Sequence, residues 1–160
     1  MVTGAAEGYG HESWLRSTPY LLWRANTLVH RRLQDALEEL GVSISQWGIM
    51  EHLDEFGSLS AADVSRGIRL TPQSINTAVG VLERAGLIAR RQHPDHGRVV
   101  LWELTDAGRD VVHRGRARVA TVRSDVDAAL AASGIDTAAG LARLIESLDG
   151  PQDPFEPRWT

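Results

Sequence analysis

Four short, uncharged side chains lie close together near the middle of the chain, and their chemistry suits contact with the edges of nucleic-acid bases. They are Gln73, Ser74, Asn76 and Thr77. Glutamine and asparagine can form two hydrogen bonds with adenine, whereas serine and threonine can bond either to a base or to a phosphate. The alternative is an ordinary amphipathic helix with a solvated polar face, and these four residues alone do not separate the two interpretations.

The charge of the chain is distributed unevenly, which bears on whether nucleic acid is the partner. The 160 residues carry a net charge of −4, and acidic residues outnumber basic ones at both ends. Residues 61–120, in contrast, contain 10 arginines and 6 acidic residues, and every basic residue of the chain is arginine. Positive charge is therefore concentrated around the four polar residues, where attraction to phosphate requires it.

Helix signals on either side of these residues predict two short helices joined by a tight turn. Ser60, with Asp63 three positions later, is a typical helix start, and Gly67 is a site where that helix could end. Thr71-Pro72 predicts a second start, and Gly86 suits the left-handed end of that helix. Between them, apolar residues recur at helical spacing: Ile75, Ala78, Val79 and Leu82. Such a pair forms a helix-turn-helix, whose second helix enters the major groove of DNA.

Two apolar runs follow and predict a β-hairpin. Residues 87–91 and 99–104 are rich in apolar and β-branched side chains, and residues 93–98 have the composition of a hairpin tip. Arg90 and Arg91 on the first run could hold phosphates, although only one of two neighbouring strand residues is expected to face outward. A helix-turn-helix followed by an arginine-bearing hairpin is the plan of a winged helix.

The combined pattern resembles the MarR family of bacterial transcriptional regulators. The resemblance is carried by residues 71–82, by Glu83-Arg84-Ala85-Gly86-Leu87-Ile88, by the Asp/Gly/Arg hairpin turn and by Leu104-Thr105-Asp106-Ala107-Gly108. It implies a mainly α-helical fold with a small β-hairpin wing, in which a winged helix-turn-helix core is joined to long N- and C-terminal dimerisation helices. It also implies a homodimeric, ligand-responsive regulator, with repression as the expected action, that binds a pseudo-palindromic operator in double-stranded DNA.

Apolar stripes and helix breaks divide the chain into four segments. Residues 1–40 are expected to hold a flexible N-terminus and a first dimerisation helix, and residues 41–105 the DNA-binding domain. Residues 106–149 are expected to form C-terminal dimerisation helices, followed by a proline-rich tail at 150–160. The terminal helices have more apolar surface than a single small winged helix covers, which favours a two-fold dimer over the alternative of an intramolecular bundle.

The resemblance assigns a role to Arg98, which occupies the position of the family's wing arginine and is expected to enter the minor groove. The aspartate that usually stands two residues before it is His96 here, so either Asp95 takes over that role or the wing is looser and sensitive to pH. Positions often basic in the family are Thr77 and Val81, which predicts a shallower salt dependence of DNA binding. The full set of candidate DNA contacts is Arg69, Thr71, Pro72, Gln73, Ser74, Asn76, Thr77, Arg84, Arg90, Arg91 and Arg98.

The resemblance further implies an effector pocket, because many relatives release DNA when an aromatic acid or phenol binds between the dimerisation helices and the DNA-binding core. An arginine could neutralise a carboxylate there, and tryptophans could stack against a ring. The alternative is that the same aromatic residues belong to the hydrophobic core. The candidate residues are Trp14, Arg16, Tyr20, Trp23, His30, Trp47 and Met50.

Other classes of function find little support in the residues. The chain has no cysteine, and among its six histidines only His93 and His96 are closely spaced, so we expect no metal and no other cofactor. It has no active-site motif of an enzyme, no apolar segment long enough to span a membrane and no signal-peptide pattern. We therefore expect a soluble, cytoplasmic protein that is not an enzyme. Two rival classes remain open: a winged-helix protein-interaction module without specific DNA binding, and a metal-responsive regulator.

Overall fold

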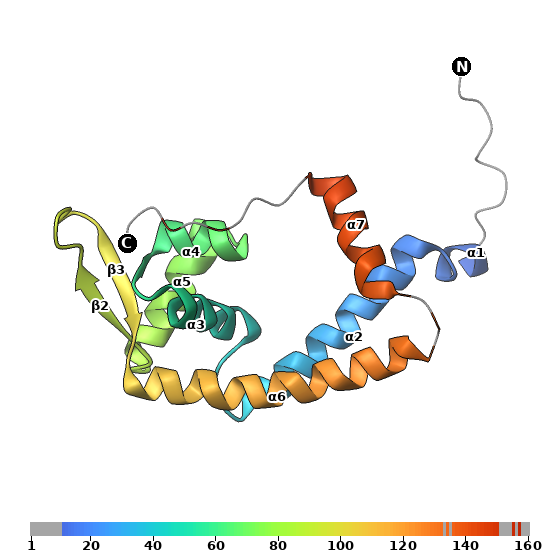
Figure 1. Cartoon of the computed structure of the whole chain (residues 1–160), viewed down its shortest axis with the longest axis horizontal. Coiled ribbons are helices and arrows are strands. Elements are labelled where there is room, and N and C mark those ends of the chain that lie inside the picture. The colour runs from blue at the N-terminus through green and yellow to red at the C-terminus, as the bar shows by residue number, and fades with distance from the viewer. Residues whose placement is uncertain (1–10, 133, 135, 151–154, 156, 158–160) are drawn as a thin grey trace, which may run out of the picture.

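The computed structural model describes residues 11–132, 134, 136–150, 155 and 157, and within them it contains helices and three short strands (Figure 1). The helices are α1 (His11–Leu15), α2 (Thr18–Glu38), α3 (Ile44–Phe56), α4 (Ala61–Ile68), α5 (Pro72–Arg84), α6 (Asp106–Ala131) and α7 (Thr137–Asp149). The strands are β1 (Leu59–Ser60), β2 (Ile88–Gln92) and β3 (Val100–Leu104). The expected mainly helical fold with a hairpin wing is confirmed, and β1 is an addition that the sequence analysis did not predict.

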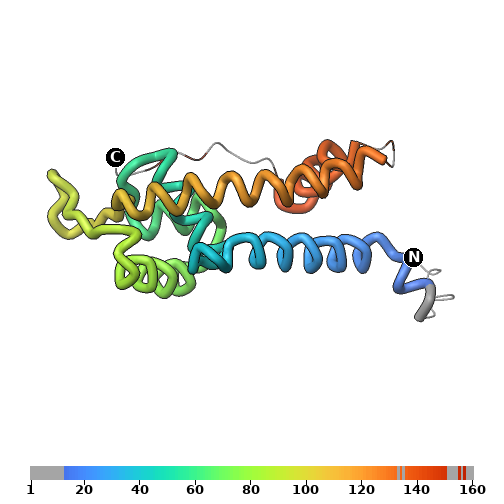
Figure 2. Tube along the Cα trace, turned by 90° about the horizontal axis from the view of Figure 1, so that it is seen from below, coloured from blue at the N-terminus to red at the C-terminus, as the bar shows by residue number. Residues whose placement is uncertain are grey.

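Two long helices, α2 and α6, run along one another, and the other elements gather toward their two ends (Figures 1 and 2). Helices α3, α4 and α5 form a compact body with the sheet at one end, which we call the winged-helix unit. Helix α7 lies toward the other end (Figure 1). Throughout the described ranges, no helix combines the length and the apolar character that crossing a membrane requires.

The helices of the winged-helix unit begin at side chains that cap them. Ser43 and Gln46 form a reciprocal capping box at the start of α3, and Ser60 and Asp63 form another at the start of α4. Thr71 caps α5 through its side-chain oxygen, and Pro72 occupies the first turn. Each cap satisfies backbone N–H groups that a helix start otherwise leaves without partners. The predicted starts at residues 60 and 71 are therefore confirmed.

Helix α4 ends later than the sequence predicts, and its end shapes the turn into α5. The helix continues through Gly67 to Ile68, and Arg69 then adopts a left-handed conformation with φ of 53°. The Ser65 hydroxyl donates to the Leu70 carbonyl at 2.6 Å and closes the turn. A left-handed conformation costs a residue with a side chain about 1–2 kcal/mol, so the surrounding contacts must hold this turn in place.

The end of α5 and the start of α6 are separated in the sequence by the wing, but hydrogen bonds join them in space. The Leu87 N–H donates to the Leu82 carbonyl at 3.0 Å, and Gly86 supplies the left-handed residue with φ of 71°. Thr105, which caps α6, donates its hydroxyl to the Gly86 carbonyl at 2.7 Å and its N–H to the Leu87 carbonyl at 3.1 Å. A Cβ at Gly108 would lie 2.0 Å from that same carbonyl oxygen, so only glycine permits this approach.

The sheet connects the wing to the start of α4. Strands β1 and β2 pair antiparallel with opposite edges of β3, in the order β1-β3-β2. Ser60, the last residue of β1, stands opposite Leu101 of β3 and is also the cap of α4. The wing and the helix-turn-helix are therefore fixed to one another through a two-residue strand.

The hydrophobic core lies inside the winged-helix unit and extends to both long helices. Leu37 of α2 and Val112 of α6 reach it from outside the unit. Burial of such apolar side chains is the main favourable contribution to the stability of a fold. The largest apolar side chains that are fully buried are Leu37, Ile49, Met50, Leu59, Val64, Ile75, Leu82, Ile88 and Val112.

An ion-pair cluster and a close contact hold α6 against α3. Arg116 places its Nη2 2.7 Å from Asp54 Oδ2 and its Nε 2.9 Å from Glu51 Oε1. Hydrogen bonding to Glu51 raises the pKa of Arg116 above its ordinary value. Beside this cluster, the indole of Trp47 faces Gly115, where an added Cβ would lie 2.2 Å from the indole Nε1.

This contact predicts opposite effects for the same substitution at two glycines inside helices. Gly115→Ala should lower the free energy of unfolding by about 1–3 kcal/mol, because the methyl group collides with the indole of Trp47. Gly48→Ala on α3, where the space is open, should raise it by about 0.5–1 kcal/mol through helix propensity. Urea denaturation of both variants measures the difference, and equal effects at the two positions would contradict the packing described.

Candidate nucleic-acid interface

Helix α5 separates its side chains into a buried face and an exposed polar face. Ile75, Val79 and Leu82 lie in the core because they recur at helical spacing on the inner side. The four polar residues that the sequence analysis singled out, Gln73, Ser74, Asn76 and Thr77, are all exposed. The second helix of a helix-turn-helix therefore presents an uncharged, hydrogen-bonding surface to the solvent.

The four polar side chains differ in whether they already form hydrogen bonds within α5 and its N-terminal cap. The Thr77 hydroxyl donates to the Gln73 carbonyl at 3.0 Å, and the Ser74 hydroxyl lies 2.8 Å from that of Thr71. The amide groups of Gln73 and Asn76 make no side-chain hydrogen bond with any residue that the structure describes. These two amides are thus the groups most available to an external partner such as a base edge.

The start of α3 lies beside this face, which the sequence analysis did not anticipate. A groove of about 490 Å³ lies between the start of α3 and the exposed face of α5. Its α3 side is lined by Ser43, Ser45 and Gln46. Gln73, Ser74 and Thr77 line the opposite side. The capping signal at Ser43 identifies a helix start in the sequence, but nothing local indicates which helix that start adjoins.

Arg69 lies in the turn before α5, and its side chain already forms an ion pair within the chain. Its guanidinium forms an ion pair with the carboxylate of Asp149, the last residue of α7. Both side chains are more than half exposed, at 56% and 57%. An exposed pair of this kind contributes little to stability, so a phosphate could replace the carboxylate.

The arginines of the wing and of the end of α5 are exposed. Arg90 and Arg91 both face solvent, although alternation predicts that only one should, because the outer half of β2 extends beyond the core. Arg91 lies 3.5 Å from Glu103, a weak contact. Across the ranges that the structure describes, no carboxylate lies within ion-pair distance of Arg84, Arg90 or Arg98.

A histidine organises the tip of the wing. The Nδ1 atom of His93 accepts hydrogen bonds from the N–H groups of Asp95 and His96, both at 3.1 Å, and the His93 ring is buried. The His96 carbonyl accepts from Val99 N–H at 2.7 Å and closes the loop. Of the two expected alternatives, a shifted role for Asp95 gains no support, because Asp95 is exposed and no ion pair with Arg98 is found among the described side chains.

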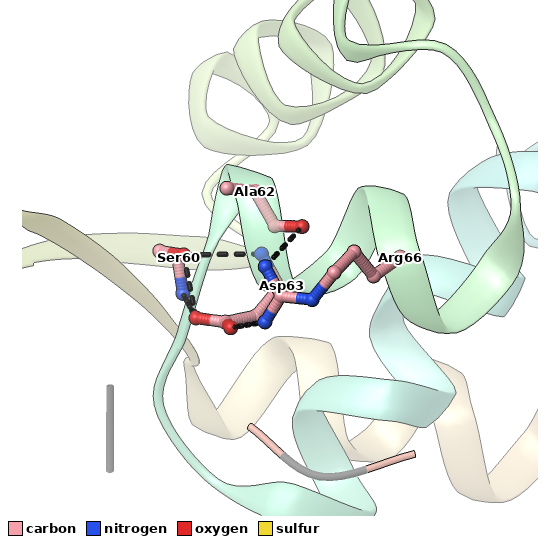
Figure 3. Close-up of polar contacts among 4 residues, drawn as sticks. All are labelled: Ser60, Ala62, Asp63 and Arg66. Atoms are coloured by element: carbon pink, nitrogen blue, oxygen red, sulfur yellow. Dashed lines mark hydrogen bonds and ion pairs between the residues drawn. The ribbon is translucent and has the colours of Figure 1, made fainter. Parts of the chain in front are cut away.

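A buried carboxylate fixes the first turn of α4 (Figure 3). Asp63 has no exposed surface, and its Oδ2 accepts from the Ser60 hydroxyl at 2.5 Å and from the Ser60 N–H at 3.3 Å. Its Oδ1 accepts from Arg66, whose guanidinium also donates to the Ala62 carbonyl at 3.4 Å. Because Ser60 belongs to β1, this network ties α4, and the turn into α5, to the sheet.

The candidate effector residues fall into two groups. Trp14 of α1 and Tyr20 and Trp23 of α2 form a row of tilted aromatic contacts, with ring centroids 5.9 Å apart for Trp14 and Tyr20 and 5.7 Å apart for Tyr20 and Trp23. Trp23 is 62% exposed, and Arg16 is also exposed close by in sequence. Of the other three, Met50 is fully buried in the core, Trp47 packs on Gly115 and His30 is exposed on α2.

The histidine pair on the wing has a structural role that bears on metal binding. The rings of His93 and His96 lie 4.9 Å apart, but the Nδ1 of His93 is already an acceptor for two backbone N–H groups. Within the described residues, no group of three or more His, Asp or Glu side chains is placed to hold a metal ion.

Comparisons with known proteins connect this geometry to a family. Residues 40–99 match the model described as the MarR family. Over 113 aligned residues the chain is 33% identical to the HTH-type transcriptional repressor Rv2887 of Mycobacterium tuberculosis. The alignment covers 71% of this chain and 81% of that protein. The chain belongs to the MarR family.

Solved structures agree with this assignment. The MarR family protein Rv2887 of M. tuberculosis, in complex with salicylic acid, is 30% identical and superposes with a TM-score of 0.60 over 82% of this chain and 96% of that one. The MarR protein of E. coli, in complex with operator DNA, has a TM-score of 0.74 over 85% of this chain and 98% of that one. At 16% identity the latter likeness concerns the fold alone. Members of the MarR family are transcriptional regulators and not enzymes.

The Asp63 network of this MarR-family chain predicts that two similar ion pairs contribute unequally to the free energy of unfolding. Asp63 pairs with Arg66 and Asp106 with Arg109, both three residues apart in a first helical turn, but the carboxylate of Asp106 is fully exposed. Asp63→Ala should lower the free energy of unfolding by about 1–3 kcal/mol, because buried donors lose their acceptor. Asp106→Ala should cost clearly less. Chemical denaturation measures both variants, and similar losses would contradict the structural role given to Asp63.

Proposed function

We propose that the protein is a cytoplasmic, homodimeric transcriptional repressor that binds a pseudo-palindromic duplex and responds to a small aromatic effector. The observation that supports DNA binding most directly is the exposed polar face of α5, which occurs together with exposed arginines on the wing. The repressor relative at 33% identity supports the same action for this chain.

The contacts follow from the position of each side chain on the winged-helix unit. Gln73, Ser74, Asn76 and Thr77 read base edges in the major groove, and Arg98 enters the minor groove beside it. Positive charge and the start of α5 hold the phosphate backbone, which positions the protein without selecting a sequence. The residues assigned to this backbone contact are Arg69, Thr71, Pro72, Arg84, Arg90 and Arg91.

A second copy of the chain covers apolar side chains that one copy leaves exposed. Leu148 of α7 is 79% exposed, and Ile145 on the same helix is more than half exposed. Leu21 and Leu28 of α2 add to this surface. A two-fold dimer through α2 and α7 buries these residues and sets two copies of α5 on successive half-sites of a duplex.

The effector site of the proposal lies at the N-terminal end of α2. Trp14, Tyr20 and Trp23 offer ring faces for stacking, and Arg16 offers a cation for a carboxylate. The salicylic acid bound by Rv2887 is a ligand of this chemical class. Such a ligand changes DNA affinity only if it binds one spacing of the two DNA-binding domains better than the other.

DNA binding is tested by selecting duplexes from a random pool and measuring affinity for the selected sequence. The selected duplex should contain two inverted half-sites about 10 base pairs apart, and it should bind two chains with an affinity that falls as salt rises. Arg98→Ala should weaken binding by about 1–3 kcal/mol, as expected for a good groove contact. Arg123→Ala, a matched loss of charge in the second half of α6, should change it much less. Affinity independent of salt would favour the rival protein-interaction module.

Effector binding is tested by titrating salicylate against the complex with the selected duplex. Salicylate should quench tryptophan fluorescence and weaken DNA binding, because stacking and the Arg16 contact occur at exposed aromatic rings. Arg16→Gln should reduce both effects, whereas Arg31→Gln, farther along α2, should not. Quenching without any change in DNA affinity would show a binding site that has no regulatory role.

A further inference from the structure

The tip of the wing is a closed loop that places Arg98 inside a tight turn. The His96 carbonyl accepts from the Val99 N–H at 2.7 Å, so Gly97 and Arg98 are the two central residues of that turn. At the base of the loop, the His93 N–H donates to the Val99 carbonyl at 3.0 Å. The direction in which the exposed side chain of Arg98 leaves the wing therefore depends on the conformation of this loop.

The imidazole of His93 adds two further hydrogen bonds to this loop. Its Nδ1 accepts from the N–H groups of Asp95 and His96, both at 3.1 Å. Pro94, which lies between them and His93, has no N–H and fixes its own backbone torsion φ. An asparagine or aspartate side chain commonly closes a turn in this way, because its oxygen accepts from an N–H two residues later. In this wing a ring nitrogen takes the place of that oxygen.

This use of Nδ1 requires that His93 is neutral. A nitrogen that accepts hydrogen bonds carries no proton, so the proton of the neutral ring lies on Nε2. When the ring binds a second proton, Nδ1 becomes a donor that faces two other donors, and both hydrogen bonds are lost. Histidine ordinarily changes its charge between about pH 5 and 8. The two hydrogen bonds are therefore present at the upper end of this range and are lost as the pH falls through it.

The groups around the ring of His93 include charges of both signs. The ring is buried, and it shares the walls of a cavity of about 290 Å³ with Arg91 of β2 and Asp95 of the tip. Glu103 of β3 lies 3.5 Å from the guanidinium of Arg91, and the ring of His96 lies 4.9 Å from that of His93. His96 is thus a second group beside the loop that ordinarily titrates in the same pH range. The remaining residues that line the cavity are uncharged: Phe56, Ser58, Pro94 and Leu101.

We propose that His93 is a positioning residue for Arg98, and that only its neutral form holds this arginine in the conformation that enters the minor groove. The inference rests on the proposed DNA binding and adds a dependence of that binding on pH. Protonation of His93 opens the tip, releases Arg98 from its turn and weakens binding. This dependence is opposite in sign to the general effect of acid, which adds positive charge to a protein and strengthens its attraction to phosphate.

Affinity for the selected duplex, measured from about pH 8 down to about pH 5.5, tests the proposal. Over this range the affinity should fall by about three- to tenfold, the effect of losing roughly one net hydrogen bond. His93→Asn keeps an acceptor near the position of Nδ1 but does not titrate. This variant should bind as tightly as the unchanged chain at the higher pH and no more weakly at the lower one. A fall in His93→Asn as large as that of the unchanged chain would overturn the proposal.

Two further variants separate positioning from other causes. His96→Asn removes the neighbouring titratable ring and should keep the fall in affinity. His93→Leu removes the acceptor and should bind weakly at both ends of the pH range. In the Arg98→Ala background, His93→Leu should cause no additional loss, because His93 acts through Arg98. Losses that add in the double variant, or a pH dependence that disappears in His96→Asn, would contradict the role given to His93.

A measurement without DNA keeps this inference separate from the proposed function. NMR spectra of the His96→Asn variant should show the amide resonance of Asp95 shifting with the same midpoint as the ring of His93. Adding His93→Asn should abolish that shift. An Asp95 amide that does not follow the ring would overturn the proposal even if the protein binds DNA. If the amide follows the ring but no duplex is selected, the proposed DNA binding and its pH dependence fall together, and only the acceptor role of His93 remains.

Discussion

The buried carboxylate of Asp63 is the interaction on which the DNA-binding surface depends. It receives donors from Ser60 on β1 and from Arg66 on α4, so one side chain joins the sheet to the first helix of the helix-turn-helix. A buried charge is unfavourable unless every oxygen has partners, which means that the network forms completely or costs stability. With it formed, α4 has a single position against β1, and the turn to α5 follows from that position. The network therefore holds α4, which precedes α5, against the sheet that carries the wing.

The elements that local chemistry determines could be predicted from the sequence. Capping residues placed the starts of α4 and α5 at Ser60 and Thr71, and the apolar period of α5 separated its buried residues from Gln73 and Asn76. The end of α4 was predicted wrongly at Gly67, because a glycine can mark either a helix end or a close approach. Only the packed rings of His52 and Phe155 show that the second reason applies.

Features that depend on distant residues were not predictable. The two-residue strand β1 is too short to leave a pattern, and it exists because β3 offers it a free edge. The groove between α3 and α5 and the pair between Arg69 and Asp149 join residues that are far apart in the sequence, with no local signal at either partner. His93 holds the wing turn through its ring, whereas the sequence directed attention to residues 95 and 96. The MarR assignment was reached from local motifs because those motifs are caps, turns and strand ends.

The junction of α5 and α6 has a mechanical consequence. Thr105 is bonded to the carbonyls of Gly86 and Leu87, and Gly108 lets α6 lie directly on that backbone. The start of α6 is therefore bonded directly to the residues that follow α5, although the wing lies between the two helices in the sequence. Helix α6 is also the long rod that runs beside α2. A small tilt of α6 would therefore move α5 with it as a rigid body. The displacement of α5 would grow with its distance from the point about which α6 tilts.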